Sequence, residues 1–266
     1  MSSLADRIES SYGDLTPQEQ RGADFMRVHM ADLAVYNATE VARLSGVSKA
    51  TISRLYRRLG FESADELRDH VRSLRSSGSP VPGAASHAGH LEREIANLRR
   101  ALEGVDLEPA ATRIASAGRV LVVGFRNSYS MALHFRQQLV QARRSVELAP
   151  QPGQSVGEEI AGLGADDVVV LVGFRRRPEA FARLVAQLAD SSASVVLLTD
   201  PSGRRYAREA DIVIECPLDT GSAFDSYAAA SSVIGLLASM VLARTGGSRV
   251  EAINAEYAAL GELENL

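Results

Sequence analysis

The sequence predicts an α/β protein in which an all-α domain precedes a domain built on a doubly wound parallel sheet. Every pattern up to about residue 77 is helical, whereas after residue 90 short apolar, largely β-branched runs alternate with helical patterns. Between them, residues 76–90 contain no Asp, Glu, Lys or Arg and are rich in Gly, Ser and Pro, as flexible linkers are. We therefore expect domains at residues 1–77 and 91–266, joined by a linker at residues 78–90.

Composition restricts the class of protein. The chain has 266 residues, of which 45% are apolar and 23% charged, and this excludes disorder along the whole chain. No uninterrupted apolar run approaches the roughly 20 residues that span a bilayer, and the start of the chain lacks the pattern of a secretory signal. The single cysteine, Cys216, excludes an internal disulfide framework and a cysteine-based zinc cluster. We expect a soluble, cytoplasmic protein without a membrane span.

Local signals place helices in the first domain. Thr16 is a good N-cap, and Pro17 suits the first helical position, where its missing N–H costs nothing. Another helix is expected directly after Ser48, whose hydroxyl can cap it. The last begins at Ser63, with Glu66 three positions on as its capping-box partner.

Residues 39–61 have the pattern of a helix-turn-helix motif. A short helix at residues 39–45 is followed by Gly46, which suits a left-handed turn position, and then by the helix after Ser48. Residues 41–61 include five basic side chains and no acidic one, although the whole chain has a net charge of −4. The apolar residues expected to face inward are Val41, Leu44, Val47, Ile52, Leu55 and Leu59.

A helix-turn-helix motif places the N-terminal half of its second helix in the major groove of DNA. Lys49 and Thr51 are therefore expected near base edges or adjacent phosphates, and Arg54 at either. Residues 57 and 58 lie further along the helix and are expected at phosphates. The alternative is an ordinary helical hairpin with a basic surface. The candidate DNA-binding residues are Ser48, Lys49, Thr51, Ser53, Arg54, Arg57 and Arg58.

Short apolar runs predict the strands of the second domain. The strong runs are β-branched and do not alternate with polar residues, as is typical of strands buried on both faces. Their alternation with helical patterns indicates βαβ units and helices on both faces of a parallel sheet. Strands are expected at 120–123, 145–148, 168–172, 195–198 and 212–214. Helices are expected at 91–103, 109–117, 129–142, 178–189, 224–244 and 249–263.

The helix expected at residues 224–244 begins beside an acidic and an aromatic residue. Asp225 can cap this helix. Phe224 is expected in the core, or else lining a pocket.

Several short stretches resemble the signature of the RpiR/MurR family of transcriptional regulators. They are Val41-Ala42, Gly46-Val47-Ser48, Ala50-Thr51, Ser53-Arg54 and Leu59-Gly60-Phe61. The alternating region after the linker resembles the sugar isomerase (SIS) domain that these regulators carry. The resemblance implies an SIS-like second domain in a dimeric bacterial regulator that binds double-stranded operator DNA. It also implies that this domain senses a metabolite, usually a phosphorylated sugar.

Ligands of an open parallel sheet bind outside the carboxyl ends of its strands. There, free N–H groups at the start of the helix near Ser128 favour an anion. SIS domains usually carry a Ser-x-Ser-Gly-x-Thr loop after the second strong strand, but this chain has arginines at residues 175–177. Arginine binds phosphate and carboxylate in a bidentate manner, so we expect a small anionic effector. The alternatives for these arginines are a solvated loop or salt bridges across a dimer. The candidate ligand-binding residues are Gly124, Arg126, Asn127, Ser128, Gly173, Arg175, Arg176 and Thr199.

Catalysis by an SIS-type enzyme, such as a sugar-phosphate isomerase, is the rival function. Isomerisation needs a base, usually Glu or His. His134 falls inside a helical pattern, and Glu158 and Glu159, which could approach a site, are commonly just partners of a helix dipole. The sequence has no Ser/His/Asp or Cys/His set and no cluster with metal-ligand spacing. We expect a sensor without catalytic residues, metal or cofactor. A structural or partner-binding protein, the third possibility, would have no salt-dependent affinity for DNA.

A single recognition helix reads only a few base pairs, which is too little to find one site in a genome. Two-fold pairing doubles the contacts. We therefore expect a homodimer or tetramer and an inverted-repeat operator.

Overall fold

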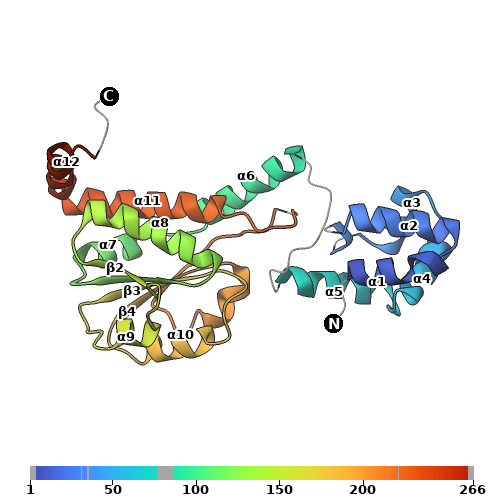
Figure 1. Ribbon diagram of the computed structural model, residues 1–266, viewed down its shortest axis with the longest axis horizontal. Helices are drawn as coiled ribbons and strands as arrows, with labels where there is room; N and C mark the ends of the chain where they lie inside the picture. Colours follow the sequence, from blue (N-terminus) through green and yellow to red (C-terminus); the bar gives the residue numbers. More distant parts are fainter. Residues whose placement is uncertain (1–3, 31, 35, 77–86, 221, 263–266) are drawn as a thin grey trace. The chain divides into compact units, whose positions relative to one another are not determined.

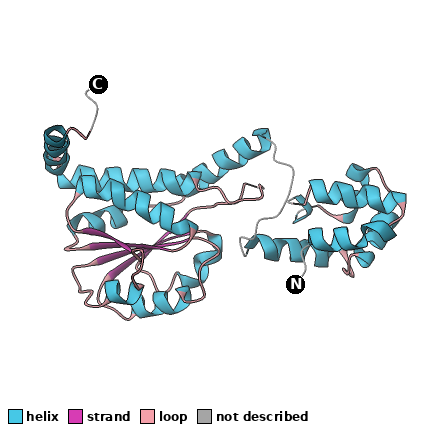
Figure 2. Cartoon of the chain, viewed as in Figure 1, coloured by secondary structure: helices cyan, strands magenta, loops and turns pink. Residues whose placement is uncertain are grey.

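The computed structural model describes residues 4–30, 32–34, 36–76, 87–220 and 222–262. The chain divides into an N-terminal unit, residues 1–94 with 219–226, and a C-terminal unit, residues 95–218 with 227–266. Figure 2 shows helices joined by loops before residue 77, and every strand of the described residues lies in the C-terminal unit. The predicted succession of an all-α region and an α/β region is therefore confirmed.

Helices α2 to α5 begin within one residue of their predicted starts, whereas α1 and the short helices η1 and η2 were not predicted. They include the two helices of the expected helix-turn-helix motif, α3 and α4 (Figure 1). The elements are α1 (Leu4–Ser11), η1 (Tyr12–Asp14), α2 (Pro17–Val28), η2 (Asp32–Ala34), α3 (Ala38–Ser45), α4 (Lys49–Arg58) and α5 (Ala64–Ser76).

All three expected caps form, and at α4 the Ser48 side chain accepts a hydrogen bond from Thr51 N. At α2, Thr16 Oγ1 accepts a hydrogen bond from Glu19 N, and the Glu19 carboxylate accepts one from Thr16 N, which completes a capping box. At α5, Ser63 Oγ accepts from Glu66 N, and the Glu66 carboxylate accepts from the backbone N–H one residue before Ser63. Local hydrogen bonding thus fixes where these helices start.

The N-terminal unit has its own hydrophobic core, and one residue of the predicted inward face lies outside it. Leu44 is 41% exposed. The buried side of α3 is centred between Val41 and Ala42, and at 3.6 residues per turn Leu44 is rotated from that centre by roughly 110°. The buried core residues are Leu4, Ile8, Leu15, Ala23, Met26, Met30, Leu33, Ala34, Val41, Ala42, Ile52, Leu55, Tyr56, Leu59, Phe61, Leu67 and Val71.

The C-terminal unit confirms the predicted alternation of strands and helices, and each expected strand forms within one or two residues of its predicted bounds. Helix α6 begins in the N-terminal unit and ends in the C-terminal one. The elements are α6 (His87–Glu103), α7 (Glu108–Ser116), β1 (Val120–Gly124), α8 (Asn127–Ala142), β2 (Val146–Ala149), α9 (Val156–Ile160), β3 (Val168–Gly173), α10 (Phe181–Ala189), β4 (Ser194–Thr199), η3 (Pro201–Tyr206), β5 (Ile212–Glu215), α11 (Ala228–Thr245) and α12 (Ser248–Leu260).

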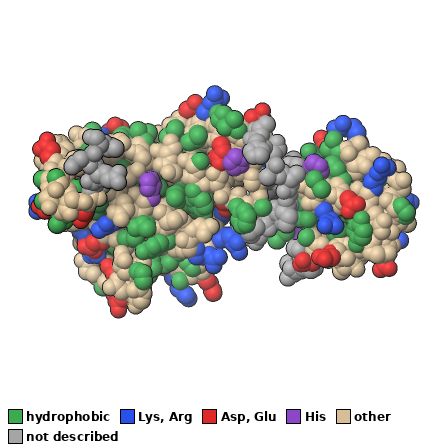
Figure 3. Space-filling view, turned by 45° about the horizontal axis from the view of Figure 1, so that its top comes forward, with side chains coloured by type: hydrophobic (Ala, Val, Ile, Leu, Met, Phe, Trp, Pro, Cys, Tyr) green, Lys and Arg blue, Asp and Glu red, His purple; other side chains and the backbone are tan. Residues whose placement is uncertain are grey.

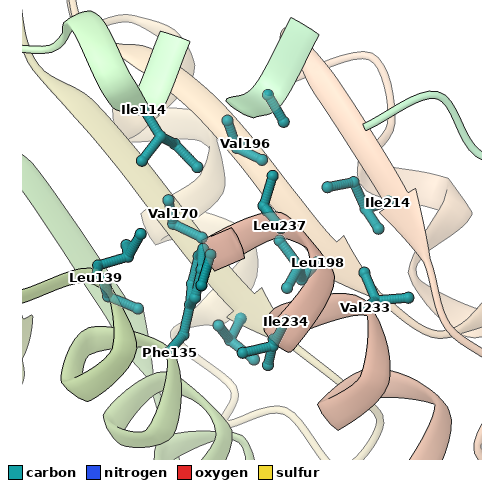
Figure 4. Close-up of a cluster of buried hydrophobic side chains, with 14 of the residues drawn as sticks. Ile114, Phe135, Leu139, Val170, Val196, Leu198, Ile214, Val233, Ile234 and Leu237 are labelled. Atoms are coloured by element: carbon teal, nitrogen blue, oxygen red, sulfur yellow. The ribbon is translucent and has the colours of Figure 1, made fainter. Parts of the chain in front are cut away.

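The five strands form one parallel sheet in the order β2-β1-β3-β4-β5. Helices α7, α8 and α11 cover one face, and α9 and α10 cover the other, so the sheet is doubly wound as predicted. Figure 4 shows the first of these layers, where Phe135 of α8 and Leu237 of α11 pack against Val170 and Val196 of the sheet. Because both faces are covered, the strands carry apolar residues at consecutive positions.

The expected linker at residues 78–90 is too long at its C-terminal end. Helix α6 begins at His87, so residues 87–90 are helical. Arg93 in this helix donates a hydrogen bond to Thr220 O at 2.9 Å, and the His90 ring lies 3.3 Å from Ser222 Oγ. These tertiary contacts stabilise a helical start that the glycine-containing sequence does not indicate. Residues 78–86 of the expected linker lie outside the described residues.

Helix α11 begins four residues later than predicted. It begins at Ala228 with Tyr227 as its N-cap residue, and the Tyr227 side chain makes no cap hydrogen bond. Asp225 precedes that N-cap residue by two positions. Phe224, expected in the core, is 74% exposed.

Helix α11 has 18 residues and a mean hydropathy of 1.5, so by length and composition alone it could cross a membrane. However, Val233, Ile234, Leu237 and Val241 of this helix are fully buried in the core of the C-terminal unit. A helix that is apolar on all sides is typical of a buried core element. Packing against the sheet and α8 therefore explains the apolar residues on the buried side of the helix.

Candidate functional site

Helix α4 presents its basic residues from one side of the helix-turn-helix motif. Gly46 adopts a φ of 69° at the end of α3, as the predicted turn requires. Ile52 and Leu55 are buried in the core, which fixes the orientation of α4. As a result, Lys49 and Arg54 are exposed, and so is residue 57. The sequence prediction of a basic outer side of α4 agrees with this arrangement.

Two candidate DNA-binding residues at the start of α4 bond to each other. Ser48 Oγ accepts a hydrogen bond from Thr51 N at 3.1 Å and lies 2.8 Å from Thr51 Oγ1. Thr51 is only 6% exposed, so the expectation that it faces outward is wrong. The physical reason is that its hydroxyl turns back to the N-cap. Ser53 is half-buried on the next turn.

The Arg58 guanidinium contacts two groups within the N-terminal unit. Its Nη1 donates to Asp14 O at 2.6 Å, and its Nε lies 3.5 Å from Glu19 Oε1. Glu19 is only 2% exposed, and its pKa lies below the ordinary value chiefly because Thr16 N–H donates to the carboxylate, with Arg58 adding its charge. Arg58 thus holds α4 to α2 although its side chain is 47% exposed, whereas Arg57, which is also exposed, donates from Nε to Ser53 O on its own helix.

Sequence reasoning missed a second basic feature beside α4. A hollow of about 400 Å³ lies between the start of α3 and the start of α4, lined by residues 37–40, Arg43 and Lys49. Arg43 is exposed, and Thr39 is exposed beside it. In helix-turn-helix proteins the first helix of the motif crosses the DNA backbone. The sequence could have indicated this feature, because the motif places the basic residue Arg43 on its first helix.

The strand order places a topological switch point between β1 and β3. These two strands are neighbours, with Gly124 opposite Val172, and the helices that follow them cover opposite faces of the sheet. Such a point is where ligands of doubly wound proteins bind. The loops after β1 and β3, which contain most of the candidate ligand-binding residues, therefore lie together at the carboxyl edge of the sheet.

A hydrogen bond ties these two loops together. Ser128, at the first turn of α8, is 5% exposed, and its Oγ accepts a hydrogen bond from Phe174 N at 3.1 Å. Gly124 allows the first turn of α8 to lie close to the end of β1, because a Cβ on residue 124 would be 2.7 Å from Ser128 O. Gly124 and Ser128 are therefore buried where the two loops meet, and their contact with a ligand stays a prediction.

Two further candidate residues belong to a buried network. Thr199 is fully buried, and its Oγ1 donates to Gly173 O at 2.8 Å. Arg177 donates to Gly173 O, Thr199 Oγ1 and Asp200 Oδ1, the last at 2.7 Å in an ion pair. Burial lowers the pKa of Arg177, while Asp200 opposes that shift. Thr199 and Gly173 are thus buried and bonded to Arg177, and their role as ligand contacts stays a prediction.

The remaining candidates are accessible at the switch point. Arg126, Asn127 and Arg176 are exposed, and Arg175 is half-buried. Arg126 is the N-cap residue of α8, and no side chain caps that helix. The structure therefore brings together three of the eight candidate residues as exposed side chains, two of them cationic.

The groups considered for catalysis lie elsewhere or have other partners. The Glu158 carboxylate accepts from Ser155 N in a capping box. Glu159 lies 3.8 Å from Arg119, which directly precedes β1, and this places it at the amino edge of the sheet. The thiol of Cys216 is buried, and burial raises its pKa to about 12. Within the described residues, no three His, Cys, Asp or Glu side chains form a group that could hold a metal.

A hollow of about 330 Å³ in the C-terminal unit also lies away from the switch point. It is found at the amino edge of β4 and β5, lined in part by Arg113, Ser194 and Asp211. Arg113 donates to Ser194 Oγ at 2.6 Å, and Ser194 Oγ donates to Asp211 at 3.1 Å. The Ser194 hydroxyl thus bridges Arg113 and Asp211.

Comparison with protein families accounts for both halves of the chain. The family described as helix-turn-helix domain, rpiR family, matches residues 2–77, and the SIS domain family matches residues 113–240. The chain belongs to the RpiR family of transcriptional regulators. The resemblance noted in the sequence is thereby confirmed, as is the function it implied, a ligand-responsive transcriptional regulator.

Curated relatives of this RpiR regulator include two proteins named as regulators. An uncharacterized HTH-type transcriptional regulator in the aarA 3′ region of Providencia stuartii is 22% identical over 227 residues, covering 80% of each chain. The uncharacterized HTH-type transcriptional regulator YbbH of Bacillus subtilis is 22% identical, covering 77% of this chain and 76% of its own.

Two solved structures share the fold. The sugar isomerase domain of an RpiR transcription factor from Sphaerobacter thermophilus has a TM-score of 0.59 at 23% identity, covering 65% of this chain and 97% of its own. The NanR protein of Vibrio vulnificus, complexed with ManNAc-6P, has a TM-score of 0.59 at 16% identity and covers 99% of this chain and 100% of its own.

Proposed function

We propose that this RpiR regulator reads an inverted-repeat operator with α4 and that its affinity for this DNA changes when a small anionic metabolite binds at the carboxyl edge of β1 and β3. The metabolite carries a phosphate or carboxylate group. The protein acts in the cytoplasm as a sensor and does not turn the metabolite over.

The exposed basic side of α4 carries the DNA-reading part of this proposal. Lys49, Arg54 and Arg57 are exposed on a helix with no acidic residue, and Arg43 extends the basic surface to α3. Such a surface neutralises phosphates and releases counterions, so binding must weaken as salt increases. Lys49 and Arg54 lie in the half of α4 that the motif directs to base edges.

The test is operator binding by the wild type and by the Lys49→Ala/Arg54→Ala/Arg57→Ala triple variant. DNA from the region next to the regulator's own gene serves as the probe, and fluorescence anisotropy is recorded from 50 to 200 mM salt. We expect the triple variant to lose specific binding. Equal affinity and an equal salt slope in the two proteins would refute the assignment of α4.

The accessible arginines at the switch point support the sensing part of the proposal. Arg126 and Arg176 offer cationic donors at the place where doubly wound sheets bind ligands. The NanR protein, which shares the fold, was solved with ManNAc-6P, an anionic sugar derivative. Calorimetry with phosphorylated sugars and organic acids, compared between the wild type and Arg126→Ala, tests this site.

The surroundings of the candidate bases support a sensor without turnover. Glu158 accepts a backbone hydrogen bond as a cap, and Glu159 lies by Arg119 at the opposite edge of the sheet. General base catalysis needs a base within hydrogen-bond reach of the substrate proton. Turnover of a bound sugar phosphate, followed by NMR, would contradict this part of the proposal.

An exposed apolar surface supports assembly into a dimer or tetramer. Leu133 of α8 and Leu236 of α11 are 39% and 45% exposed. Figure 3 shows hydrophobic side chains at the surface of the C-terminal unit, on the side where α8 and α11 lie. Apolar surface of this kind on a soluble protein commonly marks an interface. We infer that the outer side of α8 and α11 pairs two copies of the chain.

A further inference from the structure

Helix α12 is folded without a single buried residue. None of its 13 residues, all of which the structure describes, is buried, whereas α11 directly before it has several fully buried side chains. A helix of this length is marginal in water by itself, because most helical stability in proteins comes from packing of an apolar side. One copy of the chain, as far as the structure describes it, does not provide that packing for α12.

One side of α12 has the pattern of a packing surface. Its large apolar residues recur at intervals of three and four positions, which places them in one stripe along the helix. The first three are half-buried, and the last, Leu260, is 68% exposed. The stripe, which we call the α12 seam, consists of Val250, Ile253, Tyr257 and Leu260.

The start of α12 lies against α8, and its end is free of the unit. Arg249 Nε donates to Val140 O of α8 at 2.6 Å. Gly246 and Gly247 have φ values of 81° and 73°, which turn the chain sharply after α11. In Figure 1, α12 is seen nearly end-on beside the end of α11, so it runs across α11 rather than along it. Residues 258–262 are all exposed. The seam therefore extends from the edge of α8 into solvent.

Charge favours α8 of another copy as the partner of the seam. The sequences of α8 and α11 contain no Asp or Glu, and Arg136 of α8 follows the exposed Leu133 by three positions. Helix α12, in contrast, has the exposed residues Glu251 and Glu256. Complementary charges of this kind select a protein partner and its register, whereas carboxylates repel the phosphates of DNA.

We infer that the α12 seam of each copy packs against the outer side of α8 in a second copy, so that the two chains exchange their C-terminal helices. Leu260 of the seam and Leu133 of α8, both exposed in one copy, are then covered. Two-fold symmetry makes the exchange reciprocal, so that the contact forms twice in one dimer. The inference rests on the proposed pairing through α8 and α11, and it adds α12 as a further element of that interface.

A single tryptophan in the seam tests the exchange in the full-length protein. The chain contains no tryptophan, so Tyr257→Trp introduces the only indole. Sedimentation gives the mass at each protein concentration. On dilution from dimer to monomer, the emission should move to longer wavelength, because the indole passes from an apolar contact into water. Emission at short wavelength at every concentration would mean that the seam packs on its own chain. Emission at long wavelength throughout would mean that no second copy covers it, and either result overturns the exchange.

Leu260→Glu and Ala255→Glu form a matched pair of variants. Both put the same charge on an exposed position of α12, but Ala255 lies on the side of the helix opposite the seam. Leu260→Glu should raise the dissociation constant of the dimer by roughly tenfold or more, because each copy loses one covered leucine. Ala255→Glu should leave the dissociation constant unchanged. Equal dissociation constants in the two variants would contradict the exchange.

The mass and the operator binding of the wild type separate this inference from the proposed function. A wild-type protein that is a monomer at every concentration would contradict the proposed pairing and the exchange together. A wild-type dimer that binds its operator, combined with emission of Tyr257→Trp that does not follow its mass, would contradict only the exchange of α12.

Discussion

Arg57 and Arg58 are adjacent on α4 but have different surroundings, so their roles can be separated. The Arg57 side chain is exposed, and its Nε donates to Ser53 O on its own helix. Arg58 is bonded to Asp14 O and paired with the buried Glu19. Sequence position alone makes these residues equivalent, and only their tertiary contacts distinguish them.

We therefore predict opposite effects of replacing each arginine by alanine. Arg57→Ala should leave the free energy of unfolding within about 0.5 kcal/mol of the wild type and reduce the salt slope of DNA binding by about 1. Arg58→Ala should destabilise the protein by about 1 kcal/mol, because a half-exposed pair and a backbone hydrogen bond are lost. Urea denaturation and anisotropy titrations check both. If Arg57→Ala destabilised the protein and Arg58→Ala only reduced the salt slope, the two assigned roles would have to be exchanged.

Glu19 should make the stability of the protein depend on acid. Its pKa in the folded state lies below the ordinary value of 4.5, chiefly because Thr16 N–H donates to the carboxylate. A lowered pKa stabilises the fold fully above the unfolded-state value, and this contribution is lost as the pH falls through the folded-state value. The difference in unfolding free energy between the wild type and Glu19→Gln should therefore be largest at neutral pH. It should shrink below about pH 4.5. A difference that is the same at pH 7 and pH 3 would contradict this.

At the scale of the element, α4 depends on its N-cap for both stability and orientation. Ser48 accepts the hydrogen bond from Thr51 N, and Ile52 and Leu55 anchor the helix in the core. The cap lies at the end of the helix that faces the DNA in our proposal. The side chain at position 48 therefore affects the stability of α4 through the cap and the DNA affinity through its charge.

Two substitutions of Ser48 separate these effects. Ser48→Ala should cost about 1 kcal/mol of stability, because the cap is lost. Ser48→Asp should keep the cap and the stability but weaken DNA binding several-fold, because a carboxylate would approach phosphates. Denaturation and anisotropy on both variants provide the test. Normal DNA affinity in Ser48→Asp would indicate that this end of α4 does not approach the DNA.

At the scale of the whole molecule, sensing and DNA reading are in different units of the chain. An effector can change DNA affinity only if it binds two states of the protein unequally. Pairing of two copies through α8 and α11 would provide such states. It would also place two α4 helices on one operator.

The pairing surface yields a prediction about assembly. Leu236→Glu puts a charge on the exposed side of α11 and should convert the protein to a monomer at micromolar concentration, with operator affinity reduced by at least tenfold. Val28→Glu, at a 50% exposed position on α2, is the control and should change neither property. Light scattering measures the mass of both variants. A Leu236→Glu protein that keeps the wild-type mass would place the interface elsewhere.

The sequence by itself determined the local and periodic features of this protein. The capping residues Thr16 and Ser63 fixed helix starts, Gly46 fixed the turn of the motif, and apolar runs without alternation fixed the strands of a covered parallel sheet. These features depend on residues close together in the chain, or on burial of whole elements, so that short patterns carry them. The family signature in residues 41–61 likewise belongs to one continuous stretch.

Only the tertiary structure decided which of the predicted site residues are available. The Thr199 hydroxyl is bonded to the buried Arg177, and Arg58 is paired with Glu19. Arg126 and Arg176, in contrast, remain accessible. In each case the partner lies at least 22 residues away, on another element. Whether a polar side chain meets a ligand or a neighbour depends on burial and on which distant groups the fold brings within hydrogen-bond distance. A sequence pattern does not contain that information.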